Sequence, residues 1–482
     1  MNINYTIANE NVRGSRQSIP PLALLALAVA LSGCAAPLEL TSGGAALTGS
    51  YTGQDASIAA RDANGQQLVL GQSAGPDWWK LLGSPEIDAL VAMGLQNNQT
   101  IEAARANMAR AAQEAAAVNG GFAPQLSVDA RATRGNGTVT GNSLRETEGV
   151  YRIGPTLSYE LPMFGRRQQT AAYGAARVRR SDAELRAVRL SVSGNIVLRA
   201  LEIASLRAQI AELGEMVKNG EGNLDILQQA ERAGAVSKLD VIAAQNQLDQ
   251  DRAQLPVYGE KLKHAQIALT VLVGKTPSEW QTPDLRLESL TLPARLPVAI
   301  PSELLRSRPD ILVAEADIAV ASAQIGIAAA NMYPRIDLTL DIGHQGLLSG
   351  GAAETFFGLV GNIAVPIFNG GTLRARQKAA EEDYRSSLAR YRGTVTTAFS
   401  QVGEAMFRLS TTSDKEAAER ESLASANELV ELTWEGYRAG KVDYLRVLSG
   451  LRAQQQAKLS YVEANRARYD ASVSLLLASG AG

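Results

Sequence analysis

The chain has 482 residues, enough for two to four domains or one large one, and its 47 basic and 49 acidic residues give a net charge of −2. This balance gives no electrostatic basis for binding nucleic acid. One Cys and two His exclude a disulfide framework or thiolate cluster and argue against a His-rich metal site. Apolar residues reach 45% but aromatic residues only 5%, which is typical of long helices packed through small side chains.

The N-terminus has the pattern of a secretory signal peptide over residues 1–33. Arg13 and Arg16 precede a 12-residue apolar run that is too short to span a bilayer. The run ends in Leu-Ser-Gly-Cys, which resembles a bacterial lipobox and implies cleavage before Cys34 and lipids on its thiol and new amine. By the same resemblance, Ala35 implies sorting to the outer membrane. A plain signal peptide with an incidental Cys is the alternative. Residues 34–75, rich in Gly, Ser, Thr and Ala, are predicted to be a tether.

Proline placement predicts two long helical stretches. No proline lies between residues 163 and 255 or from 367 to 482, and helices tolerate interior proline badly. Apolar residues at heptad spacing, such as Ile203, Leu206, Ile210 and Leu213, support helices that pack on neighbouring helices. A single helix over 166–231 is roughly 100 Å long, which predicts a rod, a coiled coil or a tunnel wall. Six prolines between 277 and 309 mark a connector over 275–309.

The chain also repeats itself. Ile101 and Pro124 recur as Ile311 and Pro334, at an offset of 210, and Arg-Ala-Gly at 232 recurs at 438, at an offset of 206. The first repeat is predicted over 76–274, with a β-hairpin at 122–164 and a helical turn, or tip, at 232–240. The second is predicted over 310–482, with a hairpin at 332–368 and a tip at 437–446. Each repeat reads helix, hairpin, long helix, tip and returning helix.

Both hairpins alternate apolar and polar residues, the pattern of strands with one apolar face. Each run is about 10 residues long, the length of a tilted transmembrane strand. Eight of the 24 aromatic residues lie in these two segments, which is typical of an interfacial girdle. Two soluble hairpins on a water-exposed sheet are the alternative. Because four strands cannot close a barrel and open edges are not viable in lipid, a membrane barrel must be shared among several chains.

Several motifs together resemble the TolC-like outer-membrane channel family, most closely its NodT-like lipoprotein branch. They are Trp-Trp-Lys-Leu-Leu at 78–82, Pro-Ser-Glu-Leu-Leu at 301–305 followed by Arg-Pro-Asp-Ile at 308–311, Val-Pro-Ile-Phe-Asn-Gly-Gly at 365–371, and the two Ala-Gly turns. The resemblance implies a mostly α, internally duplicated fold. A long α-helical tunnel would continue a 12-stranded trimeric transmembrane β-barrel with four strands per chain. Pro162 and Pro366 would mark the strand-to-helix bends.

The same resemblance implies a passive role in the bacterial outer membrane. The homotrimer would be the exit duct of a tripartite efflux pump, joined by a periplasmic adaptor (membrane fusion) protein to an inner-membrane transporter, often of the resistance–nodulation–division type. No enzyme activity and no cofactor are expected, apart from covalent lipid on Cys34. His264 and His344 each lack a second His or Cys at ligand spacing. A protein-secretion duct and a lipid-anchored periplasmic coiled-coil scaffold are the alternative functions.

The two tips are the candidate functional sites. Gly allows the chain to reverse between antiparallel helices, and Ser237 and Asp443 can cap the returning helices. The resemblance implies that the tips receive the adaptor and close the tunnel. Ordinary helical turns with solvated charges are the alternative. The candidate tip residues are Gly234, Ser237, Asp240, Tyr437, Gly440, Asp443 and Arg446.

The second tip carries Arg446 and Ser449. The same resemblance implies that many members of the family carry an aspartate at one of these positions, where it forms an acidic ring at the constriction. Arginine and serine at these positions put a cation-binding gate in doubt. Our hypothesis is that Arg446 pairs with Asp240 or Asp443 across neighbouring helices and holds the closed state.

The polar positions of the hairpins predict a water-filled lumen of mixed charge, without strong ion preference. The candidate lumen-facing residues are Asp129, Arg131, Arg152, Glu160, Arg335, Asp337 and Asp341.

Overall fold

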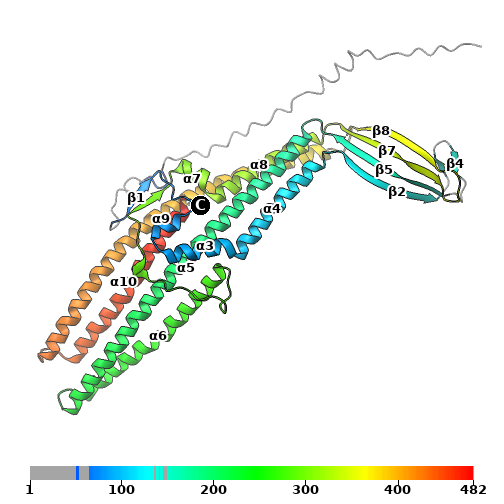
Figure 1. The fold of residues 1–482 in the computed structure, drawn as a ribbon. Coiled ribbons are helices and arrows are strands. Elements are labelled where there is room, and N and C mark those ends of the chain that lie inside the picture. Colours follow the sequence, from blue (N-terminus) through cyan, green and yellow to red (C-terminus); the bar gives the residue numbers. More distant parts are fainter. Residues whose placement is uncertain (1–49, 54–64, 135–136, 140–141, 145–148, 481–482) are drawn as a thin grey trace, which may run out of the picture. The chain divides into compact units, whose positions relative to one another are not determined.

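The structure is a computed structural model of the chain, and it describes residues 50–53, 65–134, 137–139, 142–144 and 149–480 (Figure 1). The predicted signal peptide, Cys34 and most of the predicted tether lie outside the described residues. The chain divides into two compact units. Asn119–Thr170 and Gly326–Gln377 belong to a strand unit, and the long helices make up most of the other, helical unit.

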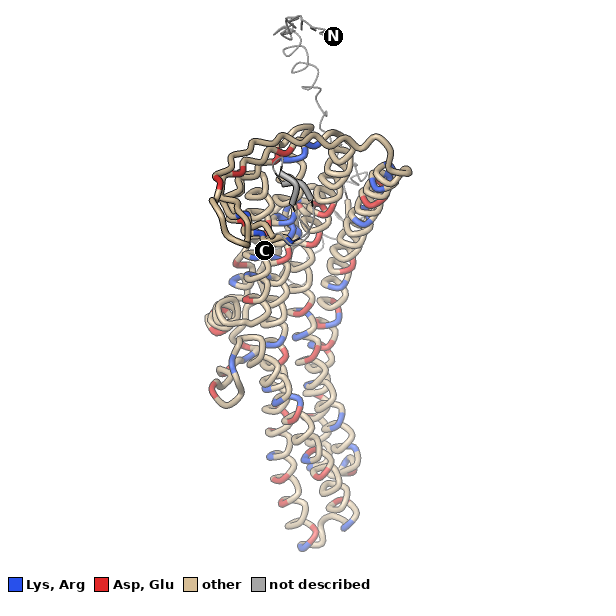
Figure 2. Tube along the Cα trace, turned by 90° about the vertical axis from the view of Figure 1, so that its right-hand side faces the viewer, with Lys and Arg blue, Asp and Glu red and all other residues tan. Residues whose placement is uncertain are grey.

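The element order is duplicated, with matched helix lengths. Helices α4 (Gln99–Gly120) and α8 (Pro309–Ala330) have 22 residues each. Helices α5 (Arg166–Arg232) and α9 (Thr372–Arg438) have 67 residues each, and α6 (Lys238–Leu272) and α10 (Tyr444–Ala478) have 35 each. A 67-residue helix is roughly 100 Å long. The predicted internal duplication and the long helices are confirmed. Basic and acidic residues are interspersed along these helices (Figure 2).

The strand unit holds a four-stranded antiparallel sheet in the order β2-β5-β7-β8. Its strands are β2 (Gln125–Arg134), β5 (Gly149–Leu161), β7 (Arg335–Leu347) and β8 (Glu354–Ala364). The two hairpins therefore lie side by side, joined by β5 and β7, and β2 and β8 are the edges. Two short strands, β3 (Gly137–Val139) and β4 (Asn142–Leu144), pair with each other in the segment of the chain that follows β2 and precedes β5.

The ladder between β5 and β7 is interrupted at Gly154 and Pro155, where the pairing passes from Ile153–His344 to Thr156–Asp341. Proline has no N–H to give to a central ladder, so an interruption is expected at this position. The backbones approach closely here. A Cβ added at Gly154 would lie 2.0 Å from the Ile342 carbonyl oxygen, and one added at Gly343 would lie 2.3 Å from that of Ile153. Both positions therefore require glycine.

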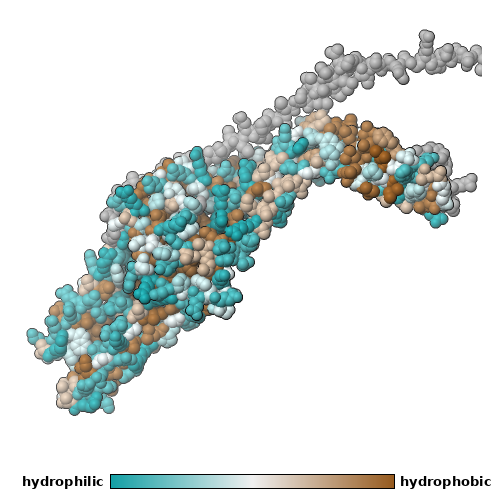
Figure 3. Space-filling model, in the orientation of Figure 1, coloured by the Kyte–Doolittle hydropathy of each residue, from teal (hydrophilic) through white to brown (hydrophobic). Residues whose placement is uncertain are grey.

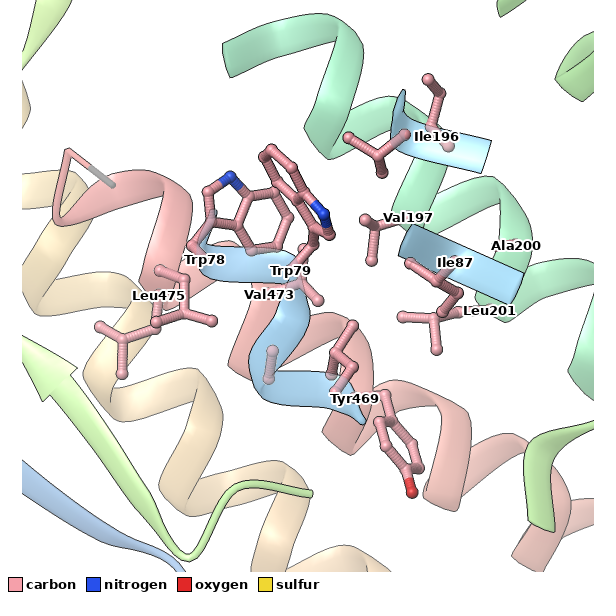
Figure 4. Close-up of a cluster of buried hydrophobic side chains, with 14 of the residues drawn as sticks. Trp78, Trp79, Ile87, Ile196, Val197, Ala200, Leu201, Tyr469, Val473 and Leu475 are labelled. Carbon is pink, nitrogen blue, oxygen red and sulfur yellow. The ribbon is translucent and has the colours of Figure 1, made fainter. Parts of the chain in front are cut away.

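The helical unit has one large core where the N-terminal elements meet the long helices. The 3₁₀ helix η1 (Trp78–Leu82) and helix α3 (Pro85–Asn97) bury Trp78, Trp79 and Ile87 against α5 and α10 (Figure 4). Ser84 caps α3 by accepting from the Ile87 N–H at 3.3 Å. The Trp-Trp-Lys-Leu-Leu motif thus has a structural role, because its two Trp side chains fill this core.

The proline-rich connector contains short elements. They are the 3₁₀ helix η2 (Leu287–Ser289), strand β6 (Arg295–Val298) and helix α7 (Pro301–Ser307). Strand β6 pairs in parallel with β1 (Gln67–Leu70), a strand in the segment that composition alone assigned to the tether. The side chains of Leu296 and Val298 are buried in the core, and this burial explains why the short β1–β6 pair is stable.

Candidate functional site

The sheet separates apolar from polar side chains, as the alternation predicts. Cross-strand pairs such as Leu126–Leu157, Leu157–Leu340 and Leu340–Leu359 place apolar residues on one face of all four strands. Much of that face is open in the single chain: Leu126 and Phe357 are 72% and 71% exposed. Hydrophobic residues gather over the strands in Figure 3. A soluble protein rarely leaves so large an apolar surface uncovered.

The opposite face carries all seven of the candidate lumen residues. The pairs Arg131–Arg152, Glu160–Asp337, Asp129–Gly154 and Thr156–Asp341 put their side chains on that face. Near the start of the long helices, charged side chains of this face form ion pairs. The Arg335 guanidinium lies 3.2 Å from Glu160 and 3.1 Å from Asp337, and Arg166 lies 3.4 Å from Glu160.

The strands pass into the long helices through two bends that follow Pro162 and Pro366. After Pro162 the backbone takes positive φ at Phe164 (56°) and Gly165 (75°), and the Phe164 ring stacks on Tyr333 with 5.0 Å between centroids. A positive φ costs a non-Gly residue energy, and the ring contact offsets part of that cost. After Pro366 the same turn is made by Gly370 (60°) and Gly371 (82°), and Asn369 accepts a long hydrogen bond from the Leu373 N–H.

The first tip lies between α5 and α6. Gly234 has φ 72°, in the left-handed region that favours glycine. The Ser237 hydroxyl accepts from the Asp240 N–H at 3.3 Å, and the Asp240 carboxylate accepts from the Ser237 N–H at 3.1 Å. This capping box fixes the start of α6.

The second tip, between α9 and α10, repeats this geometry with a simpler cap. Gly440 has φ 68°, and the Asp443 carboxylate accepts from the Arg446 N–H at 3.0 Å. Arg446 is exposed and Asp240 is half-buried. Among the described residues of this one chain, neither Asp240 nor Asp443 lies within ion-pair distance of the Arg446 side chain. The pairing hypothesis therefore stays a prediction about neighbouring chains.

A small core that sequence patterns did not reveal ties the tip regions together. Leu227, Ala244, Tyr444, Val447 and Leu448 are buried in it, and they come from α5, α6 and α10. Trp434 and Tyr437 of α9 pack their rings edge-on against Tyr444 at 6.3 and 5.7 Å. Burial, aided by Tyr437 and Asp240, raises the pKa of Tyr444 to about 12. The clue in the sequence was the concentration of Trp434, Tyr437 and Tyr444 in an aromatic-poor chain.

The Arg-Pro-Asp-Ile motif has a structural role in the helical unit. Arg308 is buried, and its guanidinium donates to the Asp310 carboxylate at 2.8 Å, to the Ala478 carbonyl at 3.0 Å and to the side chain of Gln401. The Ala478 carbonyl is at the C-terminal end of α10, where helices have unpaired acceptors and favour positive charge. Arg308 thus holds the end of the last helix against the connector and α9.

In the part of the chain that the structure describes, no group of three or more His, Cys, Asp and Glu side chains is placed to hold a metal ion.

Comparison with known proteins identifies the arrangement. The family model described as outer membrane efflux protein matches residues 90–275 and 300–481. The chain belongs to this family. The pyoverdine export outer membrane protein OpmQ of Pseudomonas aeruginosa is 29% identical over 86% of this chain and 90% of its own length. The cation efflux system protein CusC of Escherichia coli is 25% identical over 85% of this chain and 89% of its own length.

Solved structures show the same fold. A membrane protein from Pseudomonas aeruginosa matches with a TM-score of 0.75 and 27% identity, covering 83% of this chain and 94% of that one. A crystal structure of CusC also gives a TM-score of 0.75, at 25% identity over 85% and 95% of the two chains. The protein is therefore an outer-membrane channel of an efflux system. It has the helical tunnel of the family and four strands per chain of the transmembrane barrel. Channels of this family are trimers that work with efflux pumps.

Proposed function

We propose that the chain assembles as a homotrimer and is the passive exit duct of a tripartite pump that expels small molecules. The four-stranded sheet is the observation that supports this proposal. It has two edge strands, β2 and β8, and one exposed apolar face. A single chain with open edges is not viable in lipid, because unpaired backbone groups there cost several kcal/mol each. Edge-to-edge pairing of three copies closes a 12-stranded barrel and turns the apolar face toward lipid.

Helix α8 is the one described helix that is long and apolar enough to cross a membrane. Its apolar residues are buried or half-buried in the single chain, and its exposed residues are Asp310 and Glu315. We infer that α8 is part of the tunnel wall. The bilayer is then crossed by strands alone.

The proposed partners are a periplasmic adaptor at the tips and an inner-membrane transporter, in keeping with the small-molecule cargoes named for relatives. These include pyoverdine for OpmQ and toluene for TtgF of Pseudomonas putida, which is 25% identical to this chain. The proposed duct performs no chemistry and needs no cofactor. Cys34, outside the described residues, is the proposed site of lipid attachment, and the lipid would anchor the N-terminus in the outer membrane.

The first experiment separates inner from outer membranes, extracts the protein with detergent and determines its mass. We expect an outer-membrane particle of about three chain masses, because four-strand contributions require closure by other copies. Labelled palmitate should enter the wild type but not Cys34→Ser. A monomer released without detergent would refute the duct and favour a periplasmic scaffold.

Deletion of the gene then distinguishes a duct for small molecules from a duct for secreted proteins. We expect greater susceptibility of the cells to small toxic molecules and unchanged export of proteins. Loss of a secreted protein with unchanged susceptibility would instead assign the duct to protein secretion.

A further inference from the structure

Two arginines face each other on the polar side of the sheet, near the end where the hairpins turn. The register pairs Arg131 of β2 with Arg152 of β5. Like charges directly opposite on neighbouring strands are destabilising. Among the described residues neither guanidinium has a carboxylate within 4.0 Å, whereas Arg335 at the other end of the same face has two. In the same row Gln345 and then Glu354 follow, so the row carries two positive charges and one negative charge.

An aromatic ring lies beneath one of these arginines, on a face that is otherwise mostly polar. The Arg152 guanidinium carbon lies 3.8 Å from the centroid of the Phe356 ring. Phe356 can occupy this place because Gly343 has no side chain: a Cβ there would lie 2.8 Å from the ring. Phe356 is half-buried, while its neighbour Phe357 points to the apolar face. The Arg152 guanidinium thus lies over a ring that occupies the space left open by Gly343.

We propose that Arg131, Arg152 and Phe356 form a binding site for flat aromatic anions, such as aryl carboxylates, in the outer part of the lumen. The inference rests on the proposed function, because the trimeric channel is what turns this face toward water. A guanidinium binds a carboxylate through two parallel hydrogen bonds, and its flat face stacks on an aromatic ring. Arg131 binds the carboxylate, and Arg152, held from below by Phe356, presents its free face to the ligand ring.

A purely structural role for Phe356 makes a different prediction. An aromatic ring across from a strand glycine stabilises a sheet by covering the exposed backbone. Tyr151 covers Gly346 in this way, with a ring atom 3.0 Å from the position of a Cβ. Covering the backbone requires no arginine, and it has no influence on which anions pass. Arg131 places a second positive charge directly across from Arg152. Covering a glycine does not explain why this second charge is there.

The experiment measures currents through the purified wild-type trimer in a planar bilayer. The reversal potential in a KCl gradient gives the chloride-to-potassium permeability ratio and does not depend on how often the channel opens. Salicylate, and acetate as a carboxylate without a ring, are then added as blockers on the side of the hairpin turns. The variants are Arg131→Gln with Arg152→Gln, Arg152→Lys and Phe356→Leu. Phe357→Leu is the matched control, since it changes the adjacent ring on the other face.

We expect the double arginine variant to lower the permeability ratio about twofold and to lose the block by salicylate, because charged rings set the selectivity of a pore. Phe356→Leu should leave the ratio unchanged and weaken salicylate block about threefold, the size of one exposed cation–π contact. Arg152→Lys should behave as Phe356→Leu does. Phe357→Leu should change neither the ratio nor the block by salicylate, and Phe356→Leu should not change the response to acetate.

Two results would overturn the site: wild-type block by salicylate no stronger than block by acetate, or equal salicylate block in Phe356→Leu and Phe357→Leu. A wild type that forms no channel would instead refute the proposed function, and this is seen before any variant is tested.

Discussion

At the scale of residues, a buried polar cluster joins the start of the described chain to α9 and α10. Arg468 and Glu416 are 5% and 3% exposed, and their side chains lie 3.2 Å apart. Arg468 also donates to the Gln66 side-chain oxygen at 3.0 Å, and Gln66 donates to the Pro293 carbonyl at 3.2 Å. A buried charge is tolerated only when its partners are complete, so this cluster specifies how the segment before β1 docks.

The first prediction compares this buried pair with an exposed one. Glu416→Gln removes the carboxylate that lies 3.2 Å from the buried Arg468 guanidinium, and the cost is expected to be about 3 kcal/mol. The matched control is Glu382→Gln, whose pair with Arg385 is exposed at both side chains and is expected to contribute less than about 1 kcal/mol. The measurement is the melting temperature of the detergent-extracted protein. Arg468→Gln combined with Glu416→Gln should recover part of the loss. Equal melting temperatures for the two single variants would contradict the prediction.

At the scale of elements, strand pairing depends on one close approach. Gly154 and Gly343 let β5 and β7 come together where Pro155 interrupts the ladder. Gly358, on the neighbouring strand β8 and on the same polar face, has nothing within 4 Å of an added Cβ. Two glycines in similar strands thus differ in what a methyl group would meet.

The second prediction follows from that difference. Gly154→Ala places a methyl group against the backbone of β7, where no side chain can move aside, so the two hairpins are expected to separate and the barrel to fail to assemble. Gly358→Ala should assemble normally. The measurement is the fraction of extracted protein that runs as an oligomer of wild-type mass. Full assembly of Gly154→Ala would show that the sheet adapts, and failure of both variants would show that any added methyl group blocks assembly.

Elements with a local cause could be predicted from the sequence. The offsets of 210 and 206 between matching residues are the offsets between α4 and α8 and between α5 and α9. Alternation predicted both faces of the sheet, because a side chain's face is fixed by its parity along the strand. The candidate tip glycines both have positive φ at the helical turns, as their position after a long helix suggested.

Features that depend on distant partners could not be predicted in this way. The β1–β6 pairing joins residues more than 220 positions apart, and nothing in the four-residue strand at 67–70 identifies its partner. The tip core needs Leu227, Trp434 and Tyr444 from three helices. Arg468 looks like a surface residue in the sequence of α10, and its burial depends on packing against residues far away in the sequence, Glu416 and Gln66 among them.

At the scale of the whole molecule, closure at the tips depends on contacts between copies. Arg446 is in the first turn of α10, where the helix dipole disfavours a positive charge. Asp443 and Asp240 already cap helices within the chain, yet both retain free acceptor sites; Asp443 is exposed and Asp240 is half-buried. Each of three copies would thus bring an unfavourably placed arginine, one exposed carboxylate and one half-buried carboxylate to the tips, which is consistent with ion pairing between chains.

The third prediction tests this pairing by opening the tunnel. An exposed ion pair contributes about 0.5 kcal/mol, so three equivalent pairs in a trimer shift the closed-to-open ratio about tenfold. Arg446→Ala is therefore expected to raise the open fraction in single-channel recordings by about that factor, and the effect should shrink at high salt because exposed pairs are screened. Arg446→Lys, which keeps the charge, is the control and should stay mostly closed. Unchanged closure in Arg446→Ala would reject the pairing and leave the tip core around Tyr444 as the feature that holds the tips together.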